Sequence, residues 1–397
     1  MKFASQLVAF NACPSDPFKP VATPIYQTAT FEQEHADQFG RYDYSRSGNP
    51  TRTVLEEQLA QLERAERAFA FSSGLAAISS VTRLLSAGDE ILACDDLYGG
   101  TYRLFSKILN RTGVKVRYAD ACDLPRFAAA ITPETRLLYV ETPTNPLLRI
   151  CDIHALAELA HAHGALLCVD NSAMSPYLQN PLDLGADIVL HSATKYLCGH
   201  SDITAGAVAV RDSDLADQIY FLQNGVGSAL GPFDSYLLLR SLKTLKLRLD
   251  CQQSSAERIA RHLNAHPEVE RVCYPGLREH TGHNLHWEQA RGAGAVISFA
   301  TGSFERSRRI AEATRIFRVS VSFGSVNSSI SLPGCMSHAS IPAEIRSGRG
   351  FGTDLIRLSI GIEDADDLIG DLAQAFERAG ASGAVLARSA AEGNTRG

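Results

Sequence analysis

Lys195 is the residue of this chain whose position most strongly suggests covalent chemistry. It follows the apolar segment Ala186 to Leu190 after a short polar stretch that includes Ser192 and Thr194. An amine at the end of a buried strand can form a Schiff base with a carbonyl group. Most lysines are solvated surface charges, so this interpretation depends on whether the chain supplies the rest of a cofactor site.

Asp170 ends a second apolar segment, Ala165 to Val169. A carboxylate in that position is costly to remove from water unless a cation or hydrogen-bond donors meet it. A helix cap or a buried ion pair is the alternative interpretation. A protonated pyridine nitrogen would be a suitable partner, and Lys195 at the end of the next apolar segment favours that interpretation.

Ser73, Gly74 and Leu75 follow a third apolar segment, Ala68 to Phe71. The pattern predicts a strand-to-helix turn whose free amides bind a phosphate, although an ordinary capped turn has the same composition. A lysine for the aldehyde, an aspartate for the pyridine nitrogen and a helix N-terminus for the phosphate are the anchors that pyridoxal 5'-phosphate (PLP) requires. We therefore expect PLP as the cofactor.

Further polar residues follow the same segments. Ser192 and Thr194 are candidate hydroxyl donors to the phosphate, and Tyr98 is a candidate for stacking on the cofactor ring. Asn145 lies in a turn with two prolines after the segment 137–140. Ser192 and Lys195 also fit the S-x-x-K pattern of serine acyl-enzymes, but its companions S-D-N and K-T-G are absent from the sequence.

These residues must be positioned by strands. From about residue 50 onward, short apolar segments alternate with helical patterns, which is typical of a mostly parallel sheet covered by helices. The predicted strands are 68–71, 90–93, 114–118, 137–140, 165–169 and 187–190. A helix with Ile153, Leu156 and Ala160 on one face is predicted to close at Gly164. Ligands bind beyond the carboxyl ends of such strands, where the candidate residues lie.

The pattern changes along the chain and indicates four segments. Residues 1–47 contain several prolines and little periodicity, which predicts an extended N-terminal arm. Residues 48–245 form the predicted large, cofactor-binding domain of an α/β fold, and residues 246–380 a smaller C-terminal α+β domain. Residues 381–397 are rich in small and polar residues, and we expect a disordered tail.

Composition excludes several classes of protein. The chain has 397 residues, a net charge of -6, 45% hydrophobic and 21% charged residues, which favours a multidomain globular protein without a nucleic-acid footprint. No apolar stretch approaches the ~18 residues of a membrane span. The nine cysteines are scattered without the spacing of a zinc site, so we expect no metal. The first residues carry no apolar signal-peptide core, and we expect a cytoplasmic location.

The chain resembles the Cys/Met-metabolism (trans-sulfuration) family of fold-type I PLP enzymes over about residues 3 to 378, and most of all the cystathionine γ-lyases, cystathionine β-lyases and methionine γ-lyases. The resemblance rests on ordered motifs at residues 42–51, 73–74, 98–101, 141–146, 169–171, 191–196 and 357–363. It implies an aspartate-aminotransferase-like fold and a homotetramer, a dimer of dimers whose active sites are shared between subunits. It also implies that Tyr44 and Arg46 reach the cofactor phosphate of a neighbouring subunit.

The resemblance implies further that Arg357 binds the substrate α-carboxylate, beside Asn145 and Ser322. We expect Lys195 to move protons among the substrate carbons, with Tyr98 as a second acid or base. The expected reaction is a carbon–sulfur lyase reaction on a sulfur amino acid, by β- or γ-elimination, which releases a 2-oxo acid, ammonia and a thiol. A γ-replacing synthase or sulfhydrylase is the alternative. A non-enzymatic PLP-binding regulator is disfavoured because the key lysine, aspartate and arginine are all present.

Val321 departs from the family pattern. Cystathionine-handling members usually have a glutamate there, suited to the distal ammonium group of a long substrate, and Asn327 is a second departure nearby. An unpaired distal ammonium costs on the order of 1 to 3 kcal/mol. The expectation is a smaller or less polar substrate: homocysteine, methionine, cysteine or an O-acylhomoserine. The alternative is that another group compensates for the missing glutamate.

Overall fold

The computed structural model describes residues 1–10, 16, 18–350 and 352–393. Its larger sheet has seven strands in the order β1-β7-β6-β5-β4-β2-β3. The strands are β1 (Arg67–Phe71), β2 (Glu90–Cys94), β3 (Lys115–Ala119), β4 (Thr135–Glu141), β5 (Leu166–Asp170), β6 (Ile188–His191) and β7 (Gly206–Val210). Strands β3, β2, β4, β5 and β6 pair in parallel, β1 has the same direction as these five, and only β7 among the seven runs in the opposite direction. The predicted mostly parallel sheet is confirmed.

Helices cover both faces of this sheet, and alternating side chains along the strands feed two separate cores. In β1, Phe69 and Phe71 pack in one core, whereas Ala68 and Ala70 pack in the other. The surrounding helices are α2 (Pro50–Glu63), α3 (Gly74–Thr82), α4 (Gly99–Arg103), η1 (Leu104–Ile108), η2 (Leu109–Thr112), α5 (Leu124–Ala128), α6 (Ile153–Ala162), α7 (Ser175–Leu178), η3 (Pro181–Leu184), α8 (Ser213–Val226) and α9 (Pro232–Leu242). Helix α6 is the one predicted from its apolar face.

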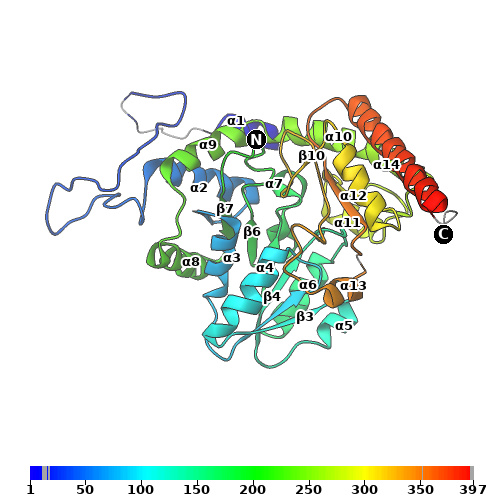
Figure 1. Cartoon of the computed structure of the whole chain (residues 1–397). Helices are drawn as coiled ribbons and strands as arrows, with labels where there is room; N and C mark the ends of the chain where they lie inside the picture. Colours follow the sequence, from blue (N-terminus) through cyan, green and yellow to red (C-terminus); the bar gives the residue numbers. More distant parts are fainter. Residues whose placement is uncertain (11–15, 17, 351, 394–397) are drawn as a thin grey trace.

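The second sheet has five strands in the order β10-β11-β12-β9-β8. Its strands are β8 (Arg271–Cys273), β9 (Val296–Ala300), β10 (Arg318–Val319), β11 (Ser329–Ser331) and β12 (Leu355–Ser359). Helices α10 (Leu245–Asn264), α11 (His283–Gln289), α12 (Phe304–Ala313), α13 (Ala343–Gly348) and α14 (Ala365–Gly393) accompany it. Figure 1 shows these elements in yellow-green to red on one side of the larger sheet. The smaller α+β unit expected from the sequence is therefore present.

Helices lie near both ends of the described part of the chain. Helix α1 (Phe3–Val8) lies within the predicted arm and is anchored by Leu7, whose carbonyl accepts a hydrogen bond from Gln58 Nε2 at 3.1 Å. After it, the blue segment in Figure 1 extends away from the body of the protein. At the other end, α14 continues to Gly393, through most of the predicted tail. This segment is rich in alanine, which has the highest helix propensity.

No helix within the described ranges is long and apolar enough to cross a membrane. The same residues contain no group of three or more His, Cys, Asp or Glu side chains arranged to hold a metal ion.

Candidate active site

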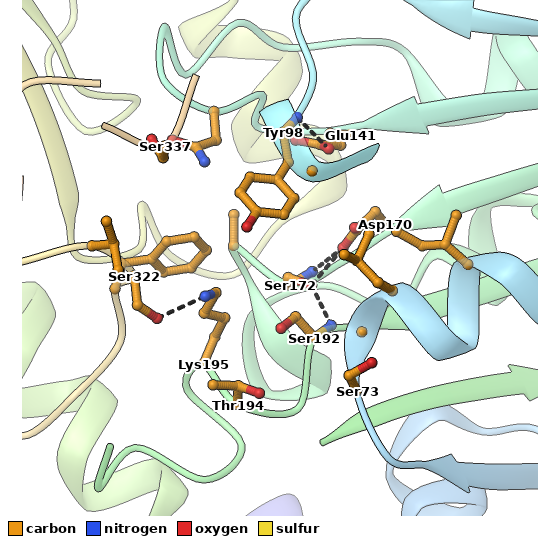
Figure 2. Close-up of a pocket in the computed structure, with 18 of the residues that line it drawn as sticks. Ser73, Tyr98, Glu141, Asp170, Ser172, Ser192, Thr194, Lys195, Ser322 and Ser337 are labelled. Carbon is orange, nitrogen blue, oxygen red and sulfur yellow. Dashed lines mark hydrogen bonds between the residues drawn. The ribbon is translucent and has the colours of Figure 1, made fainter. Parts of the chain in front are cut away.

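A cavity of about 380 Å³ opens where the carboxyl ends of the parallel strands face the five-stranded sheet. It lies where parallel-sheet proteins bind their ligands. All but two of the residues that the sequence suggests for the site line it: Ser73, Gly74, Leu75, Tyr98, Asn145, Asp170, Ser192, Thr194, Lys195, Val321, Ser322 and Arg357. Figure 2 shows Lys195 and Asp170 on different walls of this cavity.

Lys195 lies in the loop after β6 and is partly buried in the wall of the cavity. Its Nζ donates a hydrogen bond to Ser322 Oγ at 2.6 Å and lies 5.2 Å from the centre of the Phe323 ring. Burial, together with the nearby Arg357 guanidinium, lowers the pKa of Lys195 to about 8, and Asp170 partly offsets this effect. A substantial fraction of the amine is therefore neutral near physiological pH, which is the form that attacks a carbonyl group.

Asp170 is the last residue of β5 and faces the cavity from the opposite wall. Its carboxylate accepts hydrogen bonds from the Ser172 amide at 3.0 Å, the Ser172 hydroxyl at 2.5 Å and the Tyr139 hydroxyl at 3.2 Å. These contacts fix the direction of the carboxylate while leaving it on the cavity surface. It is suited to meet a cationic ring nitrogen.

Glu141 ends β4 and is paired in register with Asp170. Burial, reinforced by the charge of Asp170, raises the pKa of Glu141 well above its usual range. The raised pKa favours the neutral form of Glu141, which reduces the repulsion between the two carboxyl groups. Its Oε1 accepts a hydrogen bond from the Tyr98 amide at 2.8 Å, so it also fixes the backbone that carries the tyrosine ring.

The N-terminus of α3 points into the same cavity. Ser73 caps the helix by accepting the Ala76 amide hydrogen bond at 3.0 Å, which leaves the first-turn amides and the positive end of the helix dipole facing the space. A Cβ on Gly74 would lie 2.9 Å from the Cβ of Ser192, so glycine is what allows the two segments to touch. Thr194 uses its hydroxyl to bind the backbone of Ala205.

Arg357 lies in β12 and is 2% exposed. It donates from Nη1 to Asn145 Oδ1 at 2.8 Å and from Nη2 to the Ser322 carbonyl at 2.7 Å, whereas its Nε has no hydrogen-bond partner among the described residues. Burial lowers its pKa to about 10, and it forms no ion pair with any carboxylate in the described parts of the chain. A buried guanidinium with spare donors favours an anionic ligand.

Ser322 has a φ of +80°, in the left-handed region that non-glycine residues rarely adopt. This conformation turns its hydroxyl to Lys195 and its carbonyl to Arg357. Strain of this kind is retained where the surroundings determine a functional geometry. Ser322 therefore fixes the Lys195 amine and the Arg357 guanidinium relative to each other.

The Tyr98 ring points into the cavity near Lys195 (Figure 2) and packs edge-on against His338, with ring centroids 6.4 Å apart. A Cβ on Gly100 would lie 2.3 Å from the Tyr98 ring. Glycine at position 100 is thus required for this ring position.

Tyr44 and Arg46 are the two predicted residues that do not line the cavity. Tyr44 is 39% exposed, and the Arg46 guanidinium lies 5.0 Å from its ring. Arg46 Nε donates to Asn224 Oδ1 at 3.1 Å. Arg46 thus contacts helix α8 of its own chain rather than the cavity.

The sequence interpretation missed several residues of the cavity wall: Arg103, Glu141, Ser172, Phe323, Met336 and Ser337. A signal existed for Glu141, since it ends an apolar strand as Asp170 does. Ser172 lies two residues after Asp170, where it forms a local turn with it. No local pattern identifies Phe323, because the five-stranded sheet brings it to the cavity.

The donors of this cavity fit PLP. A partly buried amine of lowered pKa, an oriented carboxylate and an open helix N-terminus surround one space. They match the aldehyde, the ring nitrogen and the phosphate of that cofactor, respectively. Gly74 has no side chain, and this absence lets the N-terminus of α3 lie against Ser192 at the end of the cavity that suits the phosphate.

The comparisons with known proteins agree with this geometry. Cystathionine beta-lyase, chloroplastic, of Arabidopsis thaliana is 56% identical over 362 residues, which cover 91% of this chain and 78% of the relative. Cystathionine gamma-lyase of Bacillus subtilis is 48% identical and covers 90% and 94% of the two chains.

Solved structures are similar over almost the whole length. Cystathionine gamma-lyase from Lactobacillus plantarum, complexed with L-serine, has a TM-score of 0.93 and 43% identity, covering 95% of this chain and 99% of that one. Cystathionine gamma synthase from Xanthomonas oryzae pv. oryzae, in complex with cystathionine, has a TM-score of 0.94 and 40% identity, covering 96% and 99%. The family model described as Cys/Met metabolism PLP-dependent enzyme matches residues 4–377. Fold, cavity and sequence together show that this chain belongs to the Cys/Met metabolism family of PLP-dependent enzymes.

Proposed function

We propose that this protein is a carbon–sulfur lyase that cleaves cystathionine by β-elimination, giving homocysteine, pyruvate and ammonia. The observation that carries the proposal is the placement of Lys195, with its lowered pKa, in one cavity with Asp170 and Arg357. The choice of β-elimination is supported by relatives named cystathionine beta-lyase in Arabidopsis thaliana and Neurospora crassa, which are 56% and 51% identical.

In this proposal, Lys195 holds the cofactor aldehyde and Asp170 its ring nitrogen. The phosphate lies against Ser73, Gly74 and Leu75, with the hydroxyls of Ser192 and Thr194 at its sides. Tyr98 and Asn145 lie along the ring. When bound, PLP withdraws electron density from the bonds at the substrate α carbon.

The residues of the chain supply binding and proton transfer. Arg357, oriented by Asn145 and Ser322, binds the substrate carboxylate through its spare donors. Neutral Lys195 Nζ takes the proton from the substrate α carbon. The Tyr98 hydroxyl, on the same side of the cavity, donates a proton to the departing sulfur atom.

Val321 does not prevent cystathionine from being the substrate. It lines the cavity but is 59% exposed, so it belongs to the rim rather than the interior. A distal ammonium group at that position keeps its water and needs no carboxylate partner, because the cost of an unpaired charge arises from desolvation. We therefore propose cystathionine in preference to the smaller substrates suggested by the sequence.

We propose that the protein acts as a homotetramer in which Tyr44 and Arg46 complete the phosphate site of a neighbouring subunit. The proposal is supported by their position outside their own cavity and by the exposure of Tyr44. A cytoplasmic location is proposed as well, because all cysteines in the described ranges are free and disulfides are rare in reducing compartments.

Product analysis tests the proposed reaction. Purified holoenzyme is incubated separately with cystathionine, methionine, homocysteine and O-acetylhomoserine plus cysteine. We expect pyruvate and homocysteine from cystathionine, in equal amounts. Predominant 2-oxobutanoate from cystathionine would assign γ-elimination instead, and thioether formation without any 2-oxo acid would show a synthase.

A further inference from the structure

Cys122 and Cys151 lie with their Sγ atoms 3.5 Å apart, although neither residue lines the cavity. Cys122 is in the loop after β3 and is exposed to solvent, whereas Cys151 is in the loop after β4 and is fully buried. The two sulfur atoms are in contact, and a disulfide bond requires them to approach to about 2 Å. The two sulfur atoms therefore need to approach each other by a further ~1.5 Å.

The two loops are already held together beside the sulfur atoms. Arg149, close to Cys151 in the chain, forms ion pairs with Asp120 and, at 3.4 Å, with Asp95. The Cys122 amide donates to Asp120 Oδ1 at 2.9 Å. The ion pair thus keeps Cys122 opposite Cys151 and reduces the conformational freedom that bond formation would remove.

Cys151 also contacts the wall of the active-site cavity. Its amide donates to Thr142 Oγ1 at 3.0 Å, and its Sγ lies 3.8 Å from the Glu141 carbonyl oxygen. Glu141 in turn accepts the hydrogen bond from the Tyr98 amide at 2.8 Å. A displacement of Cys151 towards the surface is therefore transmitted to the residue that fixes Tyr98.

We propose that Cys122 and Cys151 form a reversible disulfide when a peroxide oxidises the protein, and that this bond lowers the turnover of the enzyme. The exposed Cys122 sulfur attacks the peroxide, which breaks the O–O bond and gives a sulfenic acid and one water molecule. Cys151 then attacks this sulfur and releases a second water molecule. Each thiol loses one proton and one electron, and the peroxide takes up both electrons.

The surroundings favour this order of events. Contact with Cys122, together with burial, raises the pKa of Cys151 well above its usual range, so Cys151 by itself reacts slowly with an oxidant. Once the Cys122 sulfur is oxidised, the proximity of Cys151 to it offsets the low reactivity of the Cys151 thiol. Cys94, the third thiol of this region, is held by the Asp96 carbonyl oxygen and the Glu141 amide.

The test uses holoenzyme treated with hydrogen peroxide, followed by alkylation of free thiols and peptide mapping. We expect a Cys122–Cys151 cross-linked peptide in the wild type, and its loss after dithiothreitol. Cystathionine turnover is expected to fall by about tenfold and to recover with the reductant, since displacements of ~1 Å near a catalytic group reduce rates by up to about a hundredfold. Peptide mapping needs no turnover, so it decides the bond even if the proposed reaction is wrong.

Cys122→Ser is the informative variant because the exposed position tolerates serine. It should form no cross-link and keep its turnover after peroxide treatment. Cys251→Ser removes another exposed thiol and is expected to behave as the wild type. A bond between other cysteines, or no bond, would overturn the assignment. A Cys122–Cys151 bond with unchanged turnover would overturn the regulatory role.

Discussion

Lys195 Nζ donates to Ser322 Oγ at 2.6 Å across 127 residues of sequence, and this contact joins the two sheets at the floor of the cavity. The lysine comes from the loop after β6, and the serine from the loop before β11. The charges of Arg357 and Asp170 both act on the reactive amine, the first lowering and the second raising its pKa. Burial of the amine in this contact region is the main cause of the lowered pKa of Lys195.

The pH dependence of cofactor capture should follow the lowered pKa of Lys195. Only the neutral amine attacks the aldehyde, so the rate at which apoenzyme captures PLP should rise with pH and level off above the pKa of about 8. Between pH 7 and pH 9 we expect about a tenfold increase. An ordinary lysine, with its pKa of 10.5, would give about a hundredfold increase without a plateau. Stopped-flow measurement of the visible absorption distinguishes the two.

Replacement of Arg357 should weaken substrate binding. Arg357→Ala removes the charge-assisted interaction with the substrate carboxylate, worth about 1.5 to 3 kcal/mol in total, and should raise KM about 10- to 150-fold. Steady-state kinetics with cystathionine measures this effect. Arg318→Ala, at an exposed position of β10 in the same sheet, is the matched control and should leave KM unchanged. Equal effects of the two substitutions would contradict the assignment.

Gly74→Ala should weaken PLP binding. The new Cβ would lie 2.9 Å from the Cβ of Ser192 and would push the N-terminus of α3 away from the phosphate. Overpacking of this kind costs about 1 to 3 kcal/mol, or roughly a 5- to 150-fold higher dissociation constant for the cofactor. Gly225→Ala in α8 meets no atom within 4 Å and serves as the control. Titration of the two apoenzymes with PLP gives the comparison.

Val321→Glu should have only a small effect. An ion pair between the new carboxylate and the distal ammonium group of cystathionine would form at an exposed rim position, where such pairs contribute about 0.2 to 1 kcal/mol. We expect KM for cystathionine to fall by no more than about fivefold, and Val321→Gln should show no change. A decrease of two orders of magnitude would show that the rim is desolvated when substrate binds.

Much of the fold could be predicted because the parallel strands are continuous apolar segments. The six predicted strands correspond to β1 through β6 with shifts of one or two residues at their ends. Strand β7, Gly206–Val210, was missed because its small residues carry little hydrophobic signal. It packs against β1 and β6 through pairings that only the tertiary structure specifies.

The site could be predicted where chemistry coincides with a strand end, as at Asp170 and Lys195. Glu141 has the same kind of position but was not distinguished from an ordinary loop residue. The contacts of Ser322 could not be foreseen. They depend on a positive φ and on the approach of two sheets, neither of which leaves a periodic pattern in the sequence.

The central claim is that Lys195 is the residue that holds PLP and carries the reaction. Borohydride reduction of the holoenzyme makes the lysine–cofactor bond permanent, and peptide mass spectrometry then locates the label. The label should be found on Lys195, and Lys195→Ala should lose both the label and pyruvate formation from cystathionine. Labelling of a different lysine, or full turnover by Lys195→Ala, would contradict the claim.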